Sequence, residues 1–216
     1  MMPLRFGRPD GAPLRILCLG AHSDDIEIGC GATVLTLLGR HPGSQVRWVV
    51  FAATGERAKE ANASAARFLE RAGESRIDLH GFRDGFFPTE MAAIKEEFER
   101  LKSFQPDLVL THRRADHHQD HRVLGELAWN TFRNHLVWEY EIPKYDGDLG
   151  NPNLMVPVER SVAEQKIATL MQCFATQRSR TWFTEETFWA LLRLRGIQCA
   201  SPTGYAEGFH AHKLVV

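Results

Sequence analysis

The chain has 216 residues, 44% of them hydrophobic and 25% charged, which suits one globular domain that folds without a disulfide framework. Its 26 basic and 27 acidic side chains give a formal net charge of -1. This balance excludes a broadly basic nucleic-acid-binding protein and gives no reason to expect an anionic membrane surface as partner. No apolar stretch approaches the roughly 18 residues that a membrane span needs, and the N-terminal segment lacks the apolar core of a secretory signal. The four cysteines form no CxxC pair, which favours a reducing, cytoplasmic compartment.

Short apolar runs alternate with segments of helical periodicity along the chain. We expect a lead-in at residues 1–13 and a single domain at residues 14–216. The predicted strands are residues 14–19, 46–53, 77–79, 108–111, 136–140 and 209–216. The predicted helices are residues 29–39, residues 56–72, a helix from an N-cap at Thr89 to Pro106, residues 121–134, a helix after a capping box of Ser161 and Glu164, and residues 185–195.

This alternation of strands and helices predicts an α/β fold. Crossover helices require a mostly parallel sheet with helices on both faces, which is a three-layer sandwich. In such folds the functional site gathers at the carboxyl ends of the strands. The loops after Leu19 and after Thr111 are therefore the places to look for chemistry.

Both of these loops carry potential metal ligands. His22, Asp24 and Asp25 follow the first strand, and four of the ten histidines lie between His112 and His121 after the fourth. Imidazole and carboxylate groups bind Zn²⁺, and also Fe²⁺, Mn²⁺ or Co²⁺. A catalytic zinc site needs three protein ligands, which His22, Asp25 and one histidine of the second loop supply, and Asp24 is then left as a general base.

Each loop taken alone also fits a solvated turn or a helix cap. The two loops together, each directly after a predicted parallel strand, favour the metal site. His112 and His117 are expected to support the site or to lie at the surface, because three ligands already fill a catalytic centre.

Two segments resemble the signatures of one known family. Residues 21–31, AHSDDIEIGCG, resemble the AHPDD motif of the PIG-L/LmbE-like zinc-dependent N-acetylglucosamine deacetylase family, and HHQDHR at residues 117–122 resembles its HxDH motif. Weaker similarity lies in TGE at residues 54–56 and GYAEGF at residues 204–209. Ser23 stands where the family has proline, a change that leaves the ligands in place.

The resemblance implies a Rossmann-like sheet and a role for eight residues. His22, Asp25 and His121 would bind zinc, and Asp24 would be the general base. His118, oriented by Asp120, would stabilise the oxyanion as an imidazolium and protonate the leaving amine. Arg57 and Asp84 would contact the substrate.

The implied function is a metal-dependent hydrolase that removes the N-acetyl or N-acyl group from an amino-sugar-containing small molecule or conjugate by zinc-activated water. Either His118 or Asp24 would return the proton to the amine. The alternatives are a hydrolase of another amide or of a phosphoester, and a non-catalytic binding protein with a degenerate site. No nucleic-acid partner and no membrane span are expected, and a homo-oligomer is compatible with the sequence.

Two further features have two interpretations each. The polar segment at residues 141–153, with Tyr145, either closes over a substrate or only connects two elements. Glu207 either supports the site from a partly buried position or lies exposed on a strand.

Overall fold

The computed structural model describes residues 6–8 and 12–214. The strands are β1 (Arg15–His22), β2 (Gln45–Ala52), β3 (Glu74–Leu79), β4 (Leu108–His112), β5 (Leu136–Tyr140), β6 (Leu154–Pro157) and β7 (Ala206–Ala211). The helices are α1 (Asp25–Arg40), α2 (Gly55–Phe68), α3 (Phe87–Leu101), α4 (Gln119–Thr131), α5 (Arg160–Cys173) and α6 (Glu185–Gln198), with short 3-10 turns η1 (Lys102–Phe104) and η2 (Ala175–Gln177).

All seven strands form one sheet in the order β3-β2-β1-β4-β5-β7-β6. Strands β1 to β5 are parallel, and β7 runs antiparallel to both of its neighbours. The strand order reverses between β1 and β4, so their carboxyl ends flank the crevice where open α/β sheets bind ligands. The predicted mostly parallel, Rossmann-like α/β fold is confirmed.

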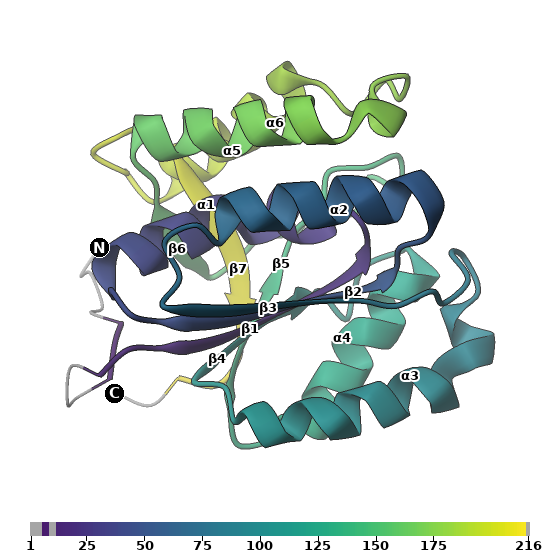
Figure 1. Cartoon of the computed structure of the whole chain (residues 1–216). Helices are drawn as coiled ribbons and strands as arrows, with labels where there is room; N and C mark the ends of the chain where they lie inside the picture. Colours follow the sequence, from purple (N-terminus) through teal and green to yellow (C-terminus); the bar gives the residue numbers. More distant parts are fainter. Residues whose placement is uncertain (1–5, 9–11, 215–216) are drawn as a thin grey trace.

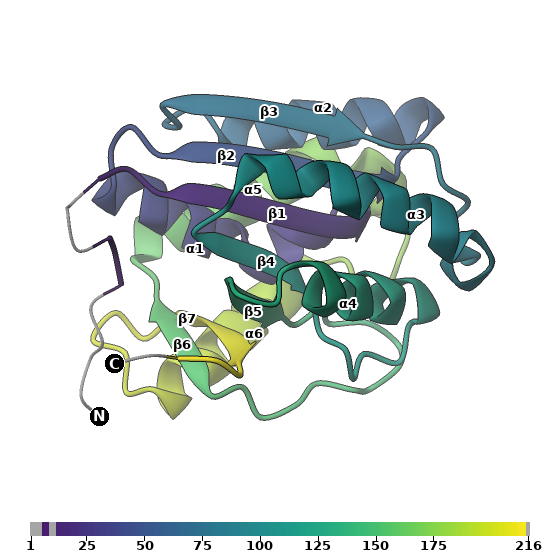
Figure 2. The ribbon, with the colours of Figure 1, turned by 90° about the horizontal axis from the view of Figure 1, so that it is seen from below.

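Helices cover both faces of the sheet (Figures 1 and 2). Helices α3 and α4 lie on one face and α1 and α2 on the other, where α5 packs on α1 and α2. Alternate residues of β1 serve the two cores: Ile16 and Cys18 face α1, whereas Leu17 and Leu19 join the α3–α4 side. Within the described part of the chain, the helices are too short or too polar to cross a bilayer.

Helices α2 and α4 begin one and two residues earlier than predicted, and α1 and α3 differ more. Helix α1 begins at Asp25 rather than at residue 29, because acidic side chains favour a helix N-terminus and almost every residue of α1 is buried, which hides its periodicity. Helix α3 begins at Phe87, with Pro88 in its first turn, so the prediction of Thr89 as N-cap is wrong. The Thr89 hydroxyl instead donates to the Phe86 carbonyl at 2.8 Å.

The region after residue 150 differs more from expectation. Glu159 is the N-cap of α5, and Glu164 accepts from Arg160 at 2.9 Å instead of closing a capping box with Ser161. The four-residue strand β6 was not predicted, and β7 begins at Ala206 rather than at residue 209. Residues 215–216 of that predicted strand, and most of the predicted lead-in, lie outside the described residues, so the division at residue 14 stays a prediction.

A buried ion pair ties β7 and α5 to α1. The Glu207 side chain accepts from the backbone N–H groups of Ala32 at 3.0 Å and Thr33 at 2.6 Å. Lys166 Nζ donates to Glu207 Oε1 and to the Ile28 carbonyl, both at 2.6 Å. Both side chains are at most 4% exposed. Glu207 is therefore buried, and it holds the helix that begins at Asp25.

We expect Lys166→Met to lower the free energy of unfolding by about 3–5 kcal/mol, because it leaves the Glu207 carboxylate buried without its counter-charge. Urea unfolding measures the change. The matched control is Lys59→Met, since Lys59 is 76% exposed in its ion pair and its loss should change the free energy of unfolding far less. Equal effects of the two substitutions would contradict the role of the buried pair.

His210 on β7 should make stability depend on pH. Burial, together with Arg113 and despite Glu139, lowers the pKa of His210 to about 4 from 6.5. Folding therefore favours the neutral ring: its contribution is complete above about pH 6.5 and is lost as the pH falls towards 4. We expect His210→Gln to flatten this loss in urea unfolding at a series of pH values. Parallel pH profiles for the two proteins would refute the assignment.

Candidate metal centre

The turn from β1 into α1 presents the first group of polar side chains. His22 is the last residue of β1, Asp24 is the N-cap of α1, and Asp25 is its first residue. Asp25 Oδ2 accepts from the His22 backbone N–H at 2.6 Å, which closes the turn. His22 and Asp25 therefore face the same side of the sheet edge.

The turn from β4 into α4 presents the second group. His118 is the N-cap of α4, and Asp120 and His121 lie in its first turn. His118 Nδ1 accepts from the Asp120 backbone N–H at 3.3 Å. The N-termini of α1 and α4 thus meet at one place, where their exposed N–H groups favour negative charge.

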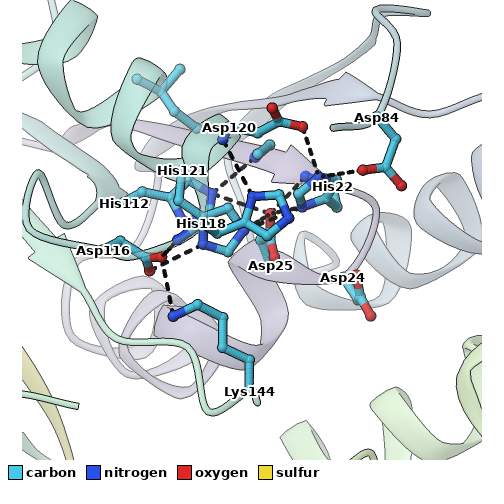
Figure 3. A network of polar contacts seen from close by, with 12 residues as sticks. His22, Asp24, Asp25, Asp84, His112, Asp116, His118, Asp120, His121 and Lys144 are labelled. Atoms are coloured by element: carbon cyan, nitrogen blue, oxygen red, sulfur yellow. Dashed lines mark hydrogen bonds and ion pairs between the residues drawn. The ribbon is translucent and has the colours of Figure 1, made fainter. Parts of the chain in front are cut away.

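The three expected ligands converge (Figure 3). His22 Nδ1 lies 3.3 Å from Asp25 Oδ2 and 3.2 Å from His121 Nε2, and the last two atoms are 3.6 Å apart. Ligands at about 2.0–2.1 Å from a tetrahedral metal ion are separated by about 3.3–3.4 Å. The spacing of these three atoms fits one divalent ion.

Outer carboxylates fix which ring nitrogens face this centre. His22 Nε2 lies 3.0 Å from Asp84 and 3.3 Å from Asp120, and His121 Nδ1 lies 3.1 Å from Asp116. Because an ionised carboxylate can only accept, the ring hydrogens sit on these outer nitrogens. His22 Nδ1 and His121 Nε2 are left to face Asp25, as ligand histidines do in carboxylate–histidine–metal arrangements.

The carboxylates of the centre favour a bound positive charge. Burial alone would lower the pKa of His22, but Asp25, Asp120 and Asp84 raise it well above its ordinary value. Burial and His112 instead lower the pKa of His121 to about 3. Burial would raise the pKa of Asp25, but the surrounding histidines hold it well below its usual range. A proton on His22 or a divalent ion would meet the same demand for positive charge.

More than one group of side chains in the described residues could take part in binding. The groups with potential ligand atoms within 4.8 Å of one another are His22, His118 and His121; Asp25, His112 and His121; and His22, Asp84 and Asp120. His22 and His121 each occur in two of these groups. The two expected histidine ligands are thus shared between groups, and Asp25 belongs to one of them.

Asp24 lies beside the cluster rather than within it (Figure 3). Arg57 donates to Asp24 Oδ1 at 2.7 Å. Burial raises the pKa of Asp24, and the Arg57 guanidinium opposes that rise. Asp24 Oδ2 is buried and has no hydrogen-bond partner within residues 6–8 and 12–214. One carboxylate oxygen is thus held in place and the other is free to accept a proton.

Asp120 contacts the His118 ring through its backbone N–H, whereas its carboxylate is directed elsewhere. Its carboxylate accepts from the backbone N–H groups of Gly85 at 2.6 Å and Phe87 at 3.1 Å and contacts His22. The hydrogen bond from Asp120 to His118 comes from the Asp120 backbone. Burial and then His22 lower the pKa of His118, whereas Asp120 and Asp25 raise it, and the net lowering opposes the expected imidazolium.

The two expected substrate-contacting residues lie at the border of the centre. The Asp84 side chain is 77% exposed on the turn before α3, although it reaches His22. Arg57 is half-buried, pairs with Asp24, and stacks over Phe174 with its guanidinium carbon 5.6 Å from the ring centroid. Both side chains are close enough to the centre to touch a molecule bound there.

Sequence reasoning missed the residues that support the centre. Asp116, which holds His121, also lies 3.1 Å from Lys144, and Lys144 lies 2.6 Å from Asp148. Asp148 in turn accepts from the His117 backbone at 2.7 Å. These contacts fasten the segment at residues 144–148 to the loop before α4. The sequence signal was weak: Lys144 and Asp148 are opposite charges four residues apart in the polar segment at residues 141–153.

Comparison with known proteins gives one family. Residues 17–132, more than half of the chain, match the model of the PIG-L family, described as GlcNAc-PI de-N-acetylase. Among curated proteins, none matches this chain.

Several solved structures share the fold. N,N'-diacetylchitobiose deacetylase from Pyrococcus horikoshii is 22% identical, with 92% of this chain and 83% of that chain covered and a TM-score of 0.72. The 4-carboxy-2-hydroxymuconate hydratase GalB from Pseudomonas putida KT2440 is 19% identical, with 94% and 98% covered and a TM-score of 0.75. The zinc-inhibited form of the teicoplanin deacetylase Orf2 is 18% identical, with 91% and 97% covered and a TM-score of 0.68.

We expect the purified protein to bind one divalent ion per chain, and His22→Ala and His121→Ala each to abolish tight binding, because each removes one of three ligands. Metal content after dialysis, measured by elemental analysis, gives the result. The matched control is His117→Asn, since His117 is an exposed histidine of the same loop. Full metal content in the His121→Ala protein would show that the ion is held elsewhere.

Proposed function

This chain belongs to the PIG-L family of GlcNAc-PI de-N-acetylases, and from that premise we propose that it removes the N-acetyl group from an amino-sugar substrate in a metal-dependent hydrolysis. The observation that carries the proposal is the convergence of His22 Nδ1, Asp25 Oδ2 and His121 Nε2 within 3.2–3.6 Å of one another, with the free oxygen of Asp24 alongside.

The proposed metal is zinc, bound by His22, Asp25 and His121. Two imidazoles and one carboxylate form a donor set that catalytic zinc uses, and Fe²⁺, Mn²⁺ and Co²⁺ also accept such ligands. A divalent ion bound there supplies a Lewis acid that polarises the acetamide carbonyl and lowers the pKa of a water molecule.

Asp24 is the proposed general base. Its Oδ1 is fixed by Arg57 and its Oδ2 is unpartnered, so Oδ2 can accept the proton of the attacking water. Burial raises the pKa of this carboxyl, which strengthens it as a base, while Arg57 keeps the charged form accessible. The base therefore has both a fixed position and a free acceptor atom.

His118 is the proposed donor to the oxyanion that forms on the substrate. Its Nδ1 accepts from the Asp120 backbone, so the neutral ring carries its hydrogen on Nε2. The ring lies with its centroid 4.9 Å from that of His22 and 4.6 Å from that of His121, next to the ligands. A neutral His118 can donate this hydrogen bond, and one such donor is commonly worth about 3–4 kcal/mol in the transition state. The Asp120 carboxylate serves the reaction through His22 instead.

Arg57 and Asp84 are the proposed substrate contacts. Asp84 offers an exposed carboxylate that can accept hydrogen bonds from sugar hydroxyls, and Arg57 offers guanidinium donors beside Asp24. The substrate would be a small N-acetylated amino sugar or a conjugate of one. The four cysteines, Cys18, Cys30, Cys173 and Cys199, are free thiols, which is in keeping with the proposed cytoplasmic location. A homo-oligomer stays a prediction.

We expect Asp24→Asn to retain its metal and to lose about 10²–10⁴-fold in kcat, because the amide cannot accept the proton from water. The assay is amine release from a panel of N-acetylhexosamines, free and conjugated, with metal content measured on the same samples. Because the GalB likeness shows that this fold also supports a hydratase, the panel includes hydration of an unsaturated carboxylic acid.

Three results would count against this proposal. Full amine release by Asp24→Asn would remove Asp24 as the base. Hydration without amine release by the wild-type protein would replace the deacetylase with another activity of the fold. Loss of metal from Asp24→Asn would show that Asp24 holds the ion rather than the proton.

A further inference from the structure

His112 occupies a central place in the cluster without being one of the three expected ligands. It is the last residue of β4, and its side chain is fully buried. Its Nε2 lies 3.1 Å from Asp25 Oδ2, the same oxygen that faces His22 and His121. One buried imidazole thus touches Asp25, the expected ligand at the start of α1.

The orientation of the His112 ring is fixed from β1. The Ala21 backbone N–H donates to His112 Nε2 at 2.9 Å. Because that nitrogen already accepts a hydrogen bond, its lone pair is directed at β1 and not at the centre of the cluster. His112 is therefore anchored to β1 through this nitrogen rather than placed to bind the ion itself.

The flat faces of the ring are also occupied. The His112 ring stacks on His121 with centroids 3.9 Å apart and an interplanar angle of 20°. Tyr140 packs against it with centroids 4.8 Å apart, and the Tyr140 hydroxyl donates to the Leu19 carbonyl at 2.6 Å. His112 is clamped between β5 and the second ligand, His121.

Gly125 allows this stacking. It lies four residues after His121 on α4, on the same face of the helix. A Cβ at Gly125 would lie 2.8 Å from the His112 carbonyl oxygen, which is closer than Cβ atoms approach backbone. The missing side chain lets α4 rest directly on the end of β4, and this brings the His121 ring onto the His112 ring.

We propose that His112 is a positioning residue that fixes the expected ligand His121 through its ring face, while its Nε2 anchors the ring to the Ala21 backbone of β1, and that Gly125 makes this stacking possible. The inference rests on the metal centre of the proposed function. We expect substitution of His112 or Gly125 to weaken metal binding, which is measured without any substrate.

The experiment compares wild-type protein with three variants. His112→Gln keeps a side-chain acceptor but removes the stacked ring, His112→Phe keeps a flat ring but removes the acceptor, and Gly125→Ala pushes α4 away from β4. His117→Asn is the matched control, since His117 is exposed in the same loop. Zn²⁺ and Co²⁺ dissociation constants come from chelator competition well below the melting temperature, with the melting temperature of the metal-free protein and the visible spectrum of the Co²⁺ protein measured in parallel.

We expect all three variants to bind Zn²⁺ and Co²⁺ about 10–100-fold more weakly, the range found when groups that orient metal ligands are removed. The Co²⁺ spectrum should keep its tetrahedral form, because the three ligands stay the same, and His117→Asn should bind like the wild type. If one His112 variant does not fold, the other and Gly125→Ala still give the result.

Two outcomes would overturn the inference. Unchanged dissociation constants with a lowered melting temperature would make His112 a purely structural residue. A Co²⁺ spectrum of altered ligand number in the His112 variants, or binding abolished in both of them, would make His112 a ligand. A wild-type protein that binds no divalent ion would instead refute the proposed function, so the two failures are distinguishable.

Discussion

The centre of this protein is a group of hydrogen-bond acceptors that the fold forces to face one another. His22 Nδ1, Asp25 Oδ2 and His121 Nε2 lie within 3.6 Å of each other. The other ring nitrogen of each histidine is hydrogen-bonded to a carboxylate outside this group, Asp120 for His22 and Asp116 for His121. Such a group is stable only around positive charge. The raised pKa of His22 and the lowered pKa of Asp25 both show that the surrounding side chains favour positive charge on His22 and negative charge on Asp25.

The sheet topology creates this convergence. Because strand order reverses between β1 and β4, the turns that leave these two strands enter α1 and α4 side by side. Both helices begin with polar residues of the centre, and both present their N-termini to it. The rest of the structure holds these two turns: Lys166 and Glu207 fasten α1 from behind, and Lys144 fastens the loop before α4.

Several residues of the centre contact two partners with different parts of the same residue, and the proposed chemistry depends on both contacts. Arg57 fixes one oxygen of Asp24 and leaves the other free. Asp120 uses its backbone to set the tautomer of His118 and its carboxylate to orient His22. The hydratase GalB has the same fold, so the fold alone does not define the reaction. The residues around this centre are what favour amide hydrolysis here.

The sequence by itself determined the α/β alternation and proposed His22 and Asp25 as ligands, because strands and one-turn spacings depend on neighbouring residues. It misplaced the start of α3 at Thr89 and the cap of α5 at Ser161, because each of these polar residues lies within the first turn and also fits the pattern of an N-cap. Only the tertiary structure assigned the Asp120 carboxylate to His22, 98 residues away, and His112 to Ala21, 91 residues away. Such contacts depend on which loops the folded sheet brings together, and no spacing along the chain encodes that.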